Sequence, residues 1–195
     1  MVNSLKTLFM WFPVLRKLFE AKTAEEFDDF LDDHFEECVQ RMEAEAHHLN
    51  GDCEEKLSAF LAAALSMPGL SVVREAYSNG RVDLTIKSES IKSTEKRLAE
   101  AKIYSGPSNH EKAIEQLVSR YSTGRQSRGY VLEYFKKPKI SELVVKLRNA
   151  ADANRPVQQN GNTEDHSMKW AYSSNHQHKS GELMHVVHIN VNLHR

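Results

Sequence analysis

The sequence has few cysteines and none of the common nucleotide-binding or hydrolase motifs. Cys38 and Cys53 are its only two cysteines. They are too few for a disulfide framework and lack a CxxC spacing, so we expect free thiols and a reducing compartment, the cytoplasm. No P-loop, dinucleotide fingerprint or Ser-His-Asp nucleophile pattern is present. These absences disfavour nucleotide-dependent enzymes of those types and serine hydrolases.

Long apolar segments are also missing. The run from Leu8 to Leu15 is interrupted by Pro13 and followed by Arg16 and Lys17, so it is too short to cross a bilayer. It lacks the small-residue cleavage site of a secretory signal. We expect a packed or interfacial amphipathic segment and no membrane span.

Neither sign of charge is in excess. There are 26 Lys and Arg residues against 27 Asp and Glu residues, a formal net charge of -1. Binding to nucleic acid would therefore need a local basic patch. The length of 195 residues predicts one compact domain with decorations.

Two amphipathic helices are predicted in the first part of the chain. Residues 23–26 form a capping box, and apolar residues then recur at steps of three and four to about Glu45. A second helix follows the Asn-Gly-Asp break at 50–52 and is stopped by Pro-Gly at 68–69. Residues 1–50 are interpreted as an N-terminal helical extension.

The second helix has a carboxylate on its inward side. Its apolar stripe, extended backward by one turn, reaches Glu54, whereas Glu55 falls on the solvent side with Ser58 and Ala62. A carboxylate on the buried face needs a functional reason, so Glu54 is a candidate site residue.

The centre of the chain, residues 51–155, predicts an alternation of strands and helices. Strands at 71–77 and 81–87 are joined by an Asn-Gly hairpin signal. A third strand is expected at 97–104, a helix from the capping-box pattern at 108–111, and a fourth strand at 130–135. The order is helix-β-β-β-helix-β.

The remaining residues complete the domain. A helix from Ser141 ends before Pro156, and the polar Gly/Asn/Gln-rich stretch 157–165 predicts a loop. Alternation from Val187 to Leu193 predicts a half-buried strand, so residues 156–195 are a polar loop and a C-terminal strand. The fold class is α/β, with a central mixed sheet flanked by helices.

Four charged residues fall where phosphodiester hydrolysis needs them. Alternate apolar residues from Val82 to Ile86 share one face of the second strand, which leaves Asp83 on the other. Glu100 and Lys102 share a face of the third strand. Two carboxylates on neighbouring strands offer hard oxygen ligands for Mg²⁺, and the lysine offers a cation near the attacking water or scissile phosphate. Glu54 can reach this group from its helix.

These residues resemble a known family. The segments Gly80-Arg81-Val82-Asp83-Leu84, Ala99-Glu100-Ala101-Lys102 and Gln116-Leu117 resemble the PD-(D/E)XK, or restriction-endonuclease-like, nuclease superfamily over about residues 52–135. The resemblance implies that Asp83 and Glu100 bind the catalytic metal with the backbone carbonyl of Ala101. It also implies that Lys102 is the catalytic lysine and that Glu54 is the helix glutamate beside them.

Gln116 is similar to the glutamine of a Gln-x-x-x-Tyr element, which helps to position the metal site and the bound strand. The pattern departs by one residue, because Tyr121 is five positions after Gln116 and Arg120 occupies the expected place. Val82 stands where a proline often precedes the first aspartate.

The resemblance implies an endonuclease that hydrolyses DNA with Mg²⁺, for which Mn²⁺ substitutes; RNA is left open as a substrate. By analogy we expect a bacterial restriction or anti-phage defence role. The small size and the absence of a recognisable target-recognition domain imply a protein partner or a homo-oligomer.

Basic residues around the fourth strand are candidates for gripping phosphates, and Tyr104 is a candidate for stacking on a base. The basic candidates are Arg120, Arg125, Arg128, Lys136 and Lys137. Ordinary solubility explains these charges equally well, and packing is the alternative for the tyrosine.

Two other functions are weighed against the nuclease. The purely structural alternative is that Asp83 caps a turn and that Glu100 and Lys102 form a solvated cross-strand ion pair. The first other function is that of a catalytically silent member of the superfamily that serves as a scaffold or nucleic-acid-binding module. The second is a protein-interaction subunit that uses the helix from Thr23 to Leu49. Six histidines in the last thirty residues lack a zinc-binding spacing, so no zinc site is expected.

Overall fold

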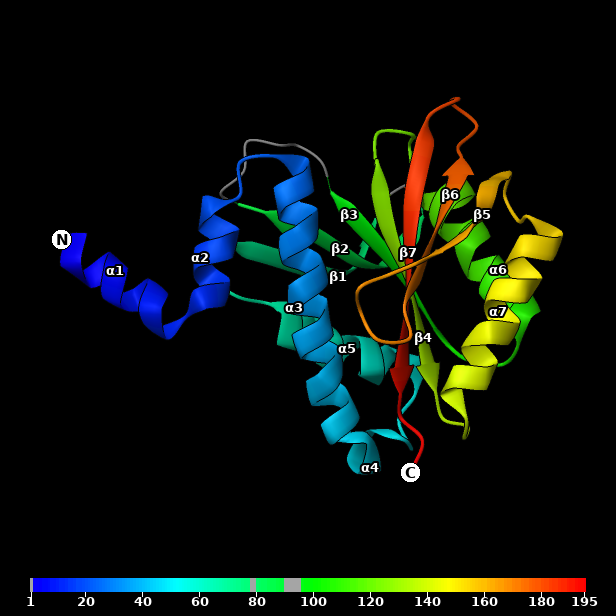
Figure 1. Cartoon of the computed structure of the whole chain (residues 1–195), viewed down its shortest axis with the longest axis horizontal. Helices are drawn as coiled ribbons and strands as arrows, with labels where there is room; N and C mark the ends of the chain where they lie inside the picture. Colours follow the sequence, from blue (N-terminus) through cyan, green and yellow to red (C-terminus); the bar gives the residue numbers. More distant parts are fainter. Residues whose placement is uncertain (1, 78–79, 90–95) are drawn as a thin grey trace.

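The computed structural model describes residues 2–77, 80–89 and 96–195. In these ranges a seven-stranded mixed sheet is flanked by helices, which confirms the predicted α/β class (Figure 1). The strands lie in the order β1-β2-β3-β4-β7-β6-β5. The helices are α1 (Val2–Trp11), α2 (Pro13–Glu20), α3 (Ala24–Ala44), α4 (Ala46–Leu49), α5 (Glu54–Leu65), α6 (Pro107–Glu115), the π-helix η1 (Gln116–Tyr121) and α7 (Ile140–Asn154). The strands are β1 (Leu70–Tyr77), β2 (Arg81–Ser88), β3 (Arg97–Ile103), β4 (Arg128–Phe135), β5 (Gln159–Asp165), β6 (Tyr172–Gln177) and β7 (Leu183–Asn192).

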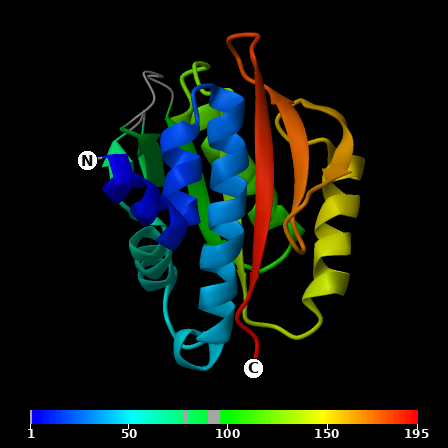
Figure 2. The ribbon, with the colours of Figure 1, turned by 60° about the vertical axis from the view of Figure 1, so that its left-hand side comes forward.

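Helices cover both faces of the sheet. α3 and α5 lie on one side and α6, η1 and α7 on the other (Figures 1 and 2). The capping box that begins α3 is confirmed: Thr23 Oγ1 accepts from the Glu26 N–H, and the Glu26 carboxylate accepts from the Thr23 N–H. The apolar stripe of α3 then packs into the core cluster beside α5, so this part of the chain is built into the domain.

The hairpin, the third and fourth strands and the helix α7 are confirmed with shifts of a few residues. β1 and β2 are antiparallel, and the predicted turn at 78–79 lies outside the described residues. The helix expected from a capping box at 108–111 instead begins at Pro107 with Gly106 as its N-cap and no side-chain cap. Proline suits the first helical position because its missing N–H is not needed there.

The loop predicted at 157–165 was wrong, because residues 159–165 form the edge strand β5 paired with β6. Sequence periodicity failed here because an edge strand tolerates polar residues on both faces. The side chain of Asp152 on α7 anchors β5 by accepting from the backbone N–H (2.7 Å) and hydroxyl (3.1 Å) of Thr163.

The C-terminal strand was expected to be half-buried, and this was also wrong. β7 lies in the interior of the sheet, parallel to β4 and antiparallel to β6. The consecutive residues 186–191 are all buried, so both faces of the strand are covered. Its polar residues are buried too: His188 and Asn190 are fully inaccessible. Each is held by hydrogen bonds, since buried polar groups need partners.

The helices α1 and α2 extend to the side of the domain (Figure 1). Together with Phe12 between them, they carry most of the exposed large apolar side chains of the described residues, with Met10 82% and Trp11 76% exposed. No helix in the described part of the chain is both long enough and apolar enough to span a membrane.

Candidate functional site

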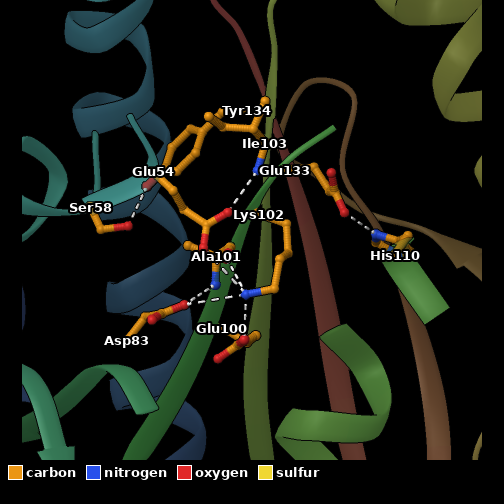
Figure 3. Close-up of polar contacts among 10 residues, drawn as sticks. All are labelled: Glu54, Ser58, Asp83, Glu100, Ala101, Lys102, Ile103, His110, Glu133 and Tyr134. Atoms are coloured by element: carbon orange, nitrogen blue, oxygen red, sulfur yellow. Dashed lines mark hydrogen bonds and ion pairs between the residues drawn. The ribbon is translucent and has the colours of Figure 1, made fainter. Parts of the chain in front are cut away.

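The structure brings the four predicted charged residues together (Figure 3). Glu54 is the first residue of α5, Asp83 lies on β2, and Glu100 and Lys102 lie on β3. Glu54 is partly buried and Glu55 is exposed, as predicted, but Ser58 and Ala62 are buried rather than on the solvent side.

The Lys102 ammonium lies inside a ring of oxygen atoms. Its Nζ is 2.6 Å from Glu100 Oε1, 2.9 Å from the backbone carbonyl oxygen of Ala101 and 3.4 Å from Glu54 Oε1. Asp83 Oδ2 is 4.0 Å away. We call these four oxygen atoms the oxygen ring. They belong to the same four residues that the superfamily resemblance assigns to a metal.

Two of the carboxylates are fixed by the backbone of β3. β2 pairs with β3 only as far as Ala99, so the next backbone N–H groups of β3 need other acceptors. Asp83 Oδ2 accepts from the Ala101 N–H (2.8 Å), and Glu54 Oε2 accepts from the Ile103 N–H (3.1 Å). The splaying of β2 from β3 therefore opens the space in which the carboxylates gather.

An irregularity in the hairpin orients Asp83. Glu75, opposite it on β1, has a positive φ of 52°, and the ladder skips this position. Val82 packs with the cluster beneath α6 and η1, while Leu84 packs toward α3 and α5. The prediction that Val82 and Leu84 share one face is therefore wrong, because the regular alternation breaks at Asp83.

Glu100 is the most buried of the three carboxylates of the oxygen ring, only 2% exposed. Burial raises its pKa to about 7, the charge of Asp83 adds to the rise, and the hydrogen bond from Lys102 opposes it. Burial would lower the pKa of Lys102, but the bond and charge of Glu100 and the charges of Glu54 and Asp83 raise it to about 12. Glu100 Oε2 has no hydrogen-bond partner among the described residues.

A pocket of about 740 Å³ opens on one side of the oxygen ring. It is lined by Lys102, Asn109, Lys112, Glu115, Gln116, Ser119 and Arg120. A smaller pocket of about 200 Å³ includes Glu54 and Asp83 in its lining. Ligands can therefore approach the oxygen ring from two sides.

The π-helix η1 begins at Gln116 and ends at Tyr121. Its turn is closed by an i→i+5 bond from the Ser122 N–H to the Leu117 carbonyl, so it takes in one residue more than an α-helical turn. In an α-helix the residue one turn after Gln116 would be Arg120, four places on. In this wider turn it is Tyr121, five places on. The π-helix therefore spans the five-residue separation of Gln116 and Tyr121, where the Gln-x-x-x-Tyr element has a separation of four.

The predicted nucleic-acid-binding residues are distributed differently. Arg120 lines the large pocket, and Arg125 is exposed. Arg128 is bound to Asp32 of α3, and Lys136 donates to the backbone carbonyl of Asp52.

Tyr104, predicted to stack on a base, is 8% exposed and stacks on Phe135 at 4.3 Å between ring centroids. The Lys137 ammonium lies over the Tyr104 ring, with Nζ 5.8 Å from the ring centroid. Of the six predicted substrate contacts, Arg120 is therefore the one that lines the large pocket beside Lys102.

The sequence reasoning missed Glu133 and His110, a buried pair next to the oxygen ring with His110 Nδ1 3.0 Å from Glu133 Oε1 (Figure 3). A lone carboxylate in the apolar run of β4 was the available signal. A separate exposed group, Glu45, His47 and His48, has ligand atoms within 4.8 Å of one another. The carboxylates of the oxygen ring are spaced more widely, with the Lys102 ammonium between them.

No family model matches the sequence, and neither a curated protein nor a solved structure matches it.

Proposed function

We propose that the chain is a metal-dependent endonuclease of the PD-(D/E)XK type that hydrolyses DNA. The observation that supports this most is the oxygen ring, which holds a positive charge where the superfamily resemblance expects a metal. Carboxylate and carbonyl oxygens are the donors that Mg²⁺ prefers. The buried Glu100 Oε2, without a partner among the described residues, is a further unused donor.

Asp83, Glu100, the Ala101 carbonyl and Glu54, directly or through water, would hold Mg²⁺, or Mn²⁺ in its place. Bound there, the ion would neutralise phosphate charge and activate a water. Lys102 orients the attacking water or moves its proton. Gln116 and Arg120 in the pocket wall hold the strand, Arg120 through its charge on a phosphate.

Cleavage of plasmid and single-stranded DNA in Mg²⁺, Mn²⁺ or EDTA tests the proposal. We expect metal-dependent cutting that Asp83→Asn lowers by about a hundredfold or more, because a charged group stabilising the transition state is lost. Asp29→Asn, at an exposed aspartate of α3, is the matched control and should cut normally. A protein that is inert in every metal on both substrates contradicts the proposal.

A bacterial restriction or anti-phage role, in the cytoplasm and with a protein partner or a second copy of the chain, belongs to the same proposal, with RNA as the alternative substrate. One observation favours a silent nucleic-acid-binding module instead: the Lys102 ammonium itself donates to three of the four oxygen atoms of the ring. That module would bind DNA equally well in EDTA and would cut no substrate.

Arg120 and Arg128 give a matched test of the nucleic-acid interface. Arg120→Ala should weaken DNA binding and lower the slope of log affinity against log salt by about one, because one phosphate contact is lost. Arg128→Ala should leave both unchanged and lower the Tm, since it removes the guanidinium bound to Asp32. Fluorescence anisotropy at several salt concentrations measures the slope. Equal effects of the two substitutions would contradict this assignment.

A further inference from the structure

Glu133 is a fully buried carboxylate that the proposed chemistry does not use. It lies on β4 as the register partner of Lys102 on the parallel strand β3. Side chains at paired positions project from the same face of a sheet, and Figure 3 shows the two side by side. Burial raises the pKa of Glu133, while the His110 bond and the charge of Lys102 oppose the rise.

A chain of buried hydrogen bonds fixes the proton positions near Glu133. The Pro156 carbonyl only accepts, so His176 Nδ1 donates to it over 3.0 Å. Burial lowers the pKa of His176 to about 4 and that of His188 well below its usual value, so both rings are neutral. Ser174 Oγ then donates to His176 Nε2 and accepts from His188 Nε2, each over 2.7 Å. His188 Nδ1 is left to accept from His110 Nε2 over 2.9 Å.

His110 Nε2–H is thus shared between His188 Nδ1 and the Tyr172 hydroxyl oxygen, which is also 2.9 Å away, and one further proton lies between His110 Nδ1 and Glu133 Oε1. Whichever of the two groups holds that proton, no group of this network donates a hydrogen bond to Glu133 Oε2. This oxygen has no hydrogen-bond partner in the part of the chain that the structure describes. A buried acceptor without a donor is costly, so Glu133 has capacity for a further donor.

The Lys102 ammonium and the proposed divalent cation need the same oxygen atoms. Nζ lies within 3.4 Å of the Glu100, Ala101 and Glu54 oxygens that would hold the ion. Like charges at such distances repel strongly in a partly buried site. The ammonium must therefore leave the oxygen ring when the ion enters.

We propose that Glu133 is a positioning residue that receives the Lys102 ammonium when a divalent cation occupies the oxygen ring. This rests on the proposed function, because it presumes that the ring binds such an ion. The flexible four-carbon stem of Lys102 allows the move between neighbouring strands. Glu133 then keeps the ammonium beside the ring instead of releasing it into the large pocket that Lys102 also lines.

The test is Mn²⁺ affinity of the full chain, measured by calorimetry for Glu133→Gln in the wild-type and Lys102→Met backgrounds. With Lys102 present, Glu133→Gln should weaken Mn²⁺ binding about tenfold, a coupling of the size seen between charged neighbours. In the Lys102→Met background the same change should alter the affinity less than about twofold. Glu133→Asp, which keeps the negative charge, should bind Mn²⁺ with most of the wild-type affinity when Lys102 is present. If Glu133→Gln does not fold, Glu133→Ala, which also removes the carboxylate, takes its place in both backgrounds with the same expected effects.

The possible outcomes separate the two proposals. An equal loss in both backgrounds would show that Glu133 acts through general charge or through folding, which overturns the role in receiving Lys102. No loss in either background, with Mn²⁺ still bound, overturns it as well. Absence of Mn²⁺ binding by the wild type and by Lys102→Met overturns the proposed function itself. Glu142→Gln, at an exposed carboxylate of α7, controls for the loss of one negative charge.

Discussion

Replacing Lys102 with methionine is expected to tighten Mn²⁺ binding while it strongly lowers the rate of DNA cleavage. The ammonium competes with the ion for the Glu100, Ala101 and Glu54 oxygens. Removing it should improve affinity about tenfold, or about 1.4 kcal/mol. Cleavage should fall by about 10²–10⁴-fold, the contribution of a group that positions or transfers a proton. Most single substitutions at a metal site weaken both properties, so opposite changes are a specific signature.

Calorimetry with Mn²⁺ and plasmid cleavage by the same preparation measure the two effects. Lys112→Met is the matched control, because Lys112 lines the large pocket from α6 without belonging to the oxygen ring. Its Mn²⁺ affinity should equal that of the wild type. Weaker binding by Lys102→Met would show that the lysine supports the ion instead of competing with it. Retained cleavage would remove Lys102 from the chemistry.

The grouping of the site was predictable because it depends on local patterns. The strand-forming runs and the Asn-Gly signal located β2 and β3, although the alternation expected in β2 breaks at Asp83, and helical spacing put Glu54 on the inward side of α5. These three elements then determine that Glu54, Asp83, Glu100 and Lys102 meet. What spacing could not give is which atom fills the centre, because that depends on side-chain rotamers and on the splaying of β2 from β3.

The C-terminal part was predicted less well for a different physical reason. β6 carries Ser174 and His176 on a buried face, where hydrogen bonds to His188 and Pro156 replace apolar packing. A strand stabilised by such a network has no hydrophobic alternation to detect. The same network hid the relation of His110 to Glu133, since its members are far apart in sequence and meet only through the sheet order β4-β7-β6.

Loss of the buried ion pair between Arg97 and Asp28 is expected to have the largest effect on stability. Arg97 begins β3 and is 1% exposed, and its Nε and Nη2 donate to the two carboxylate oxygens of Asp28 on α3 at 2.7 and 3.2 Å. Arg97→Met would leave the Asp28 carboxylate buried without its guanidinium. Breaking such a pair costs about 3–5 kcal/mol, and for a chain of this length we expect a fall in Tm of about 10 °C.

The double variant Arg97→Met with Asp28→Leu separates two reasons for that loss. Because much of the cost comes from the buried charge that remains, replacing both partners with apolar residues should recover most of the stability. Urea unfolding of the wild type, both single variants and the double variant gives the complete cycle. If the double variant is as unstable as Arg97→Met, the pair contributes through its specific hydrogen bonds. In either case a lower Tm of Arg97→Met would show that α3, interpreted from sequence as part of an extension, stabilises β3, the strand that carries Glu100 and Lys102.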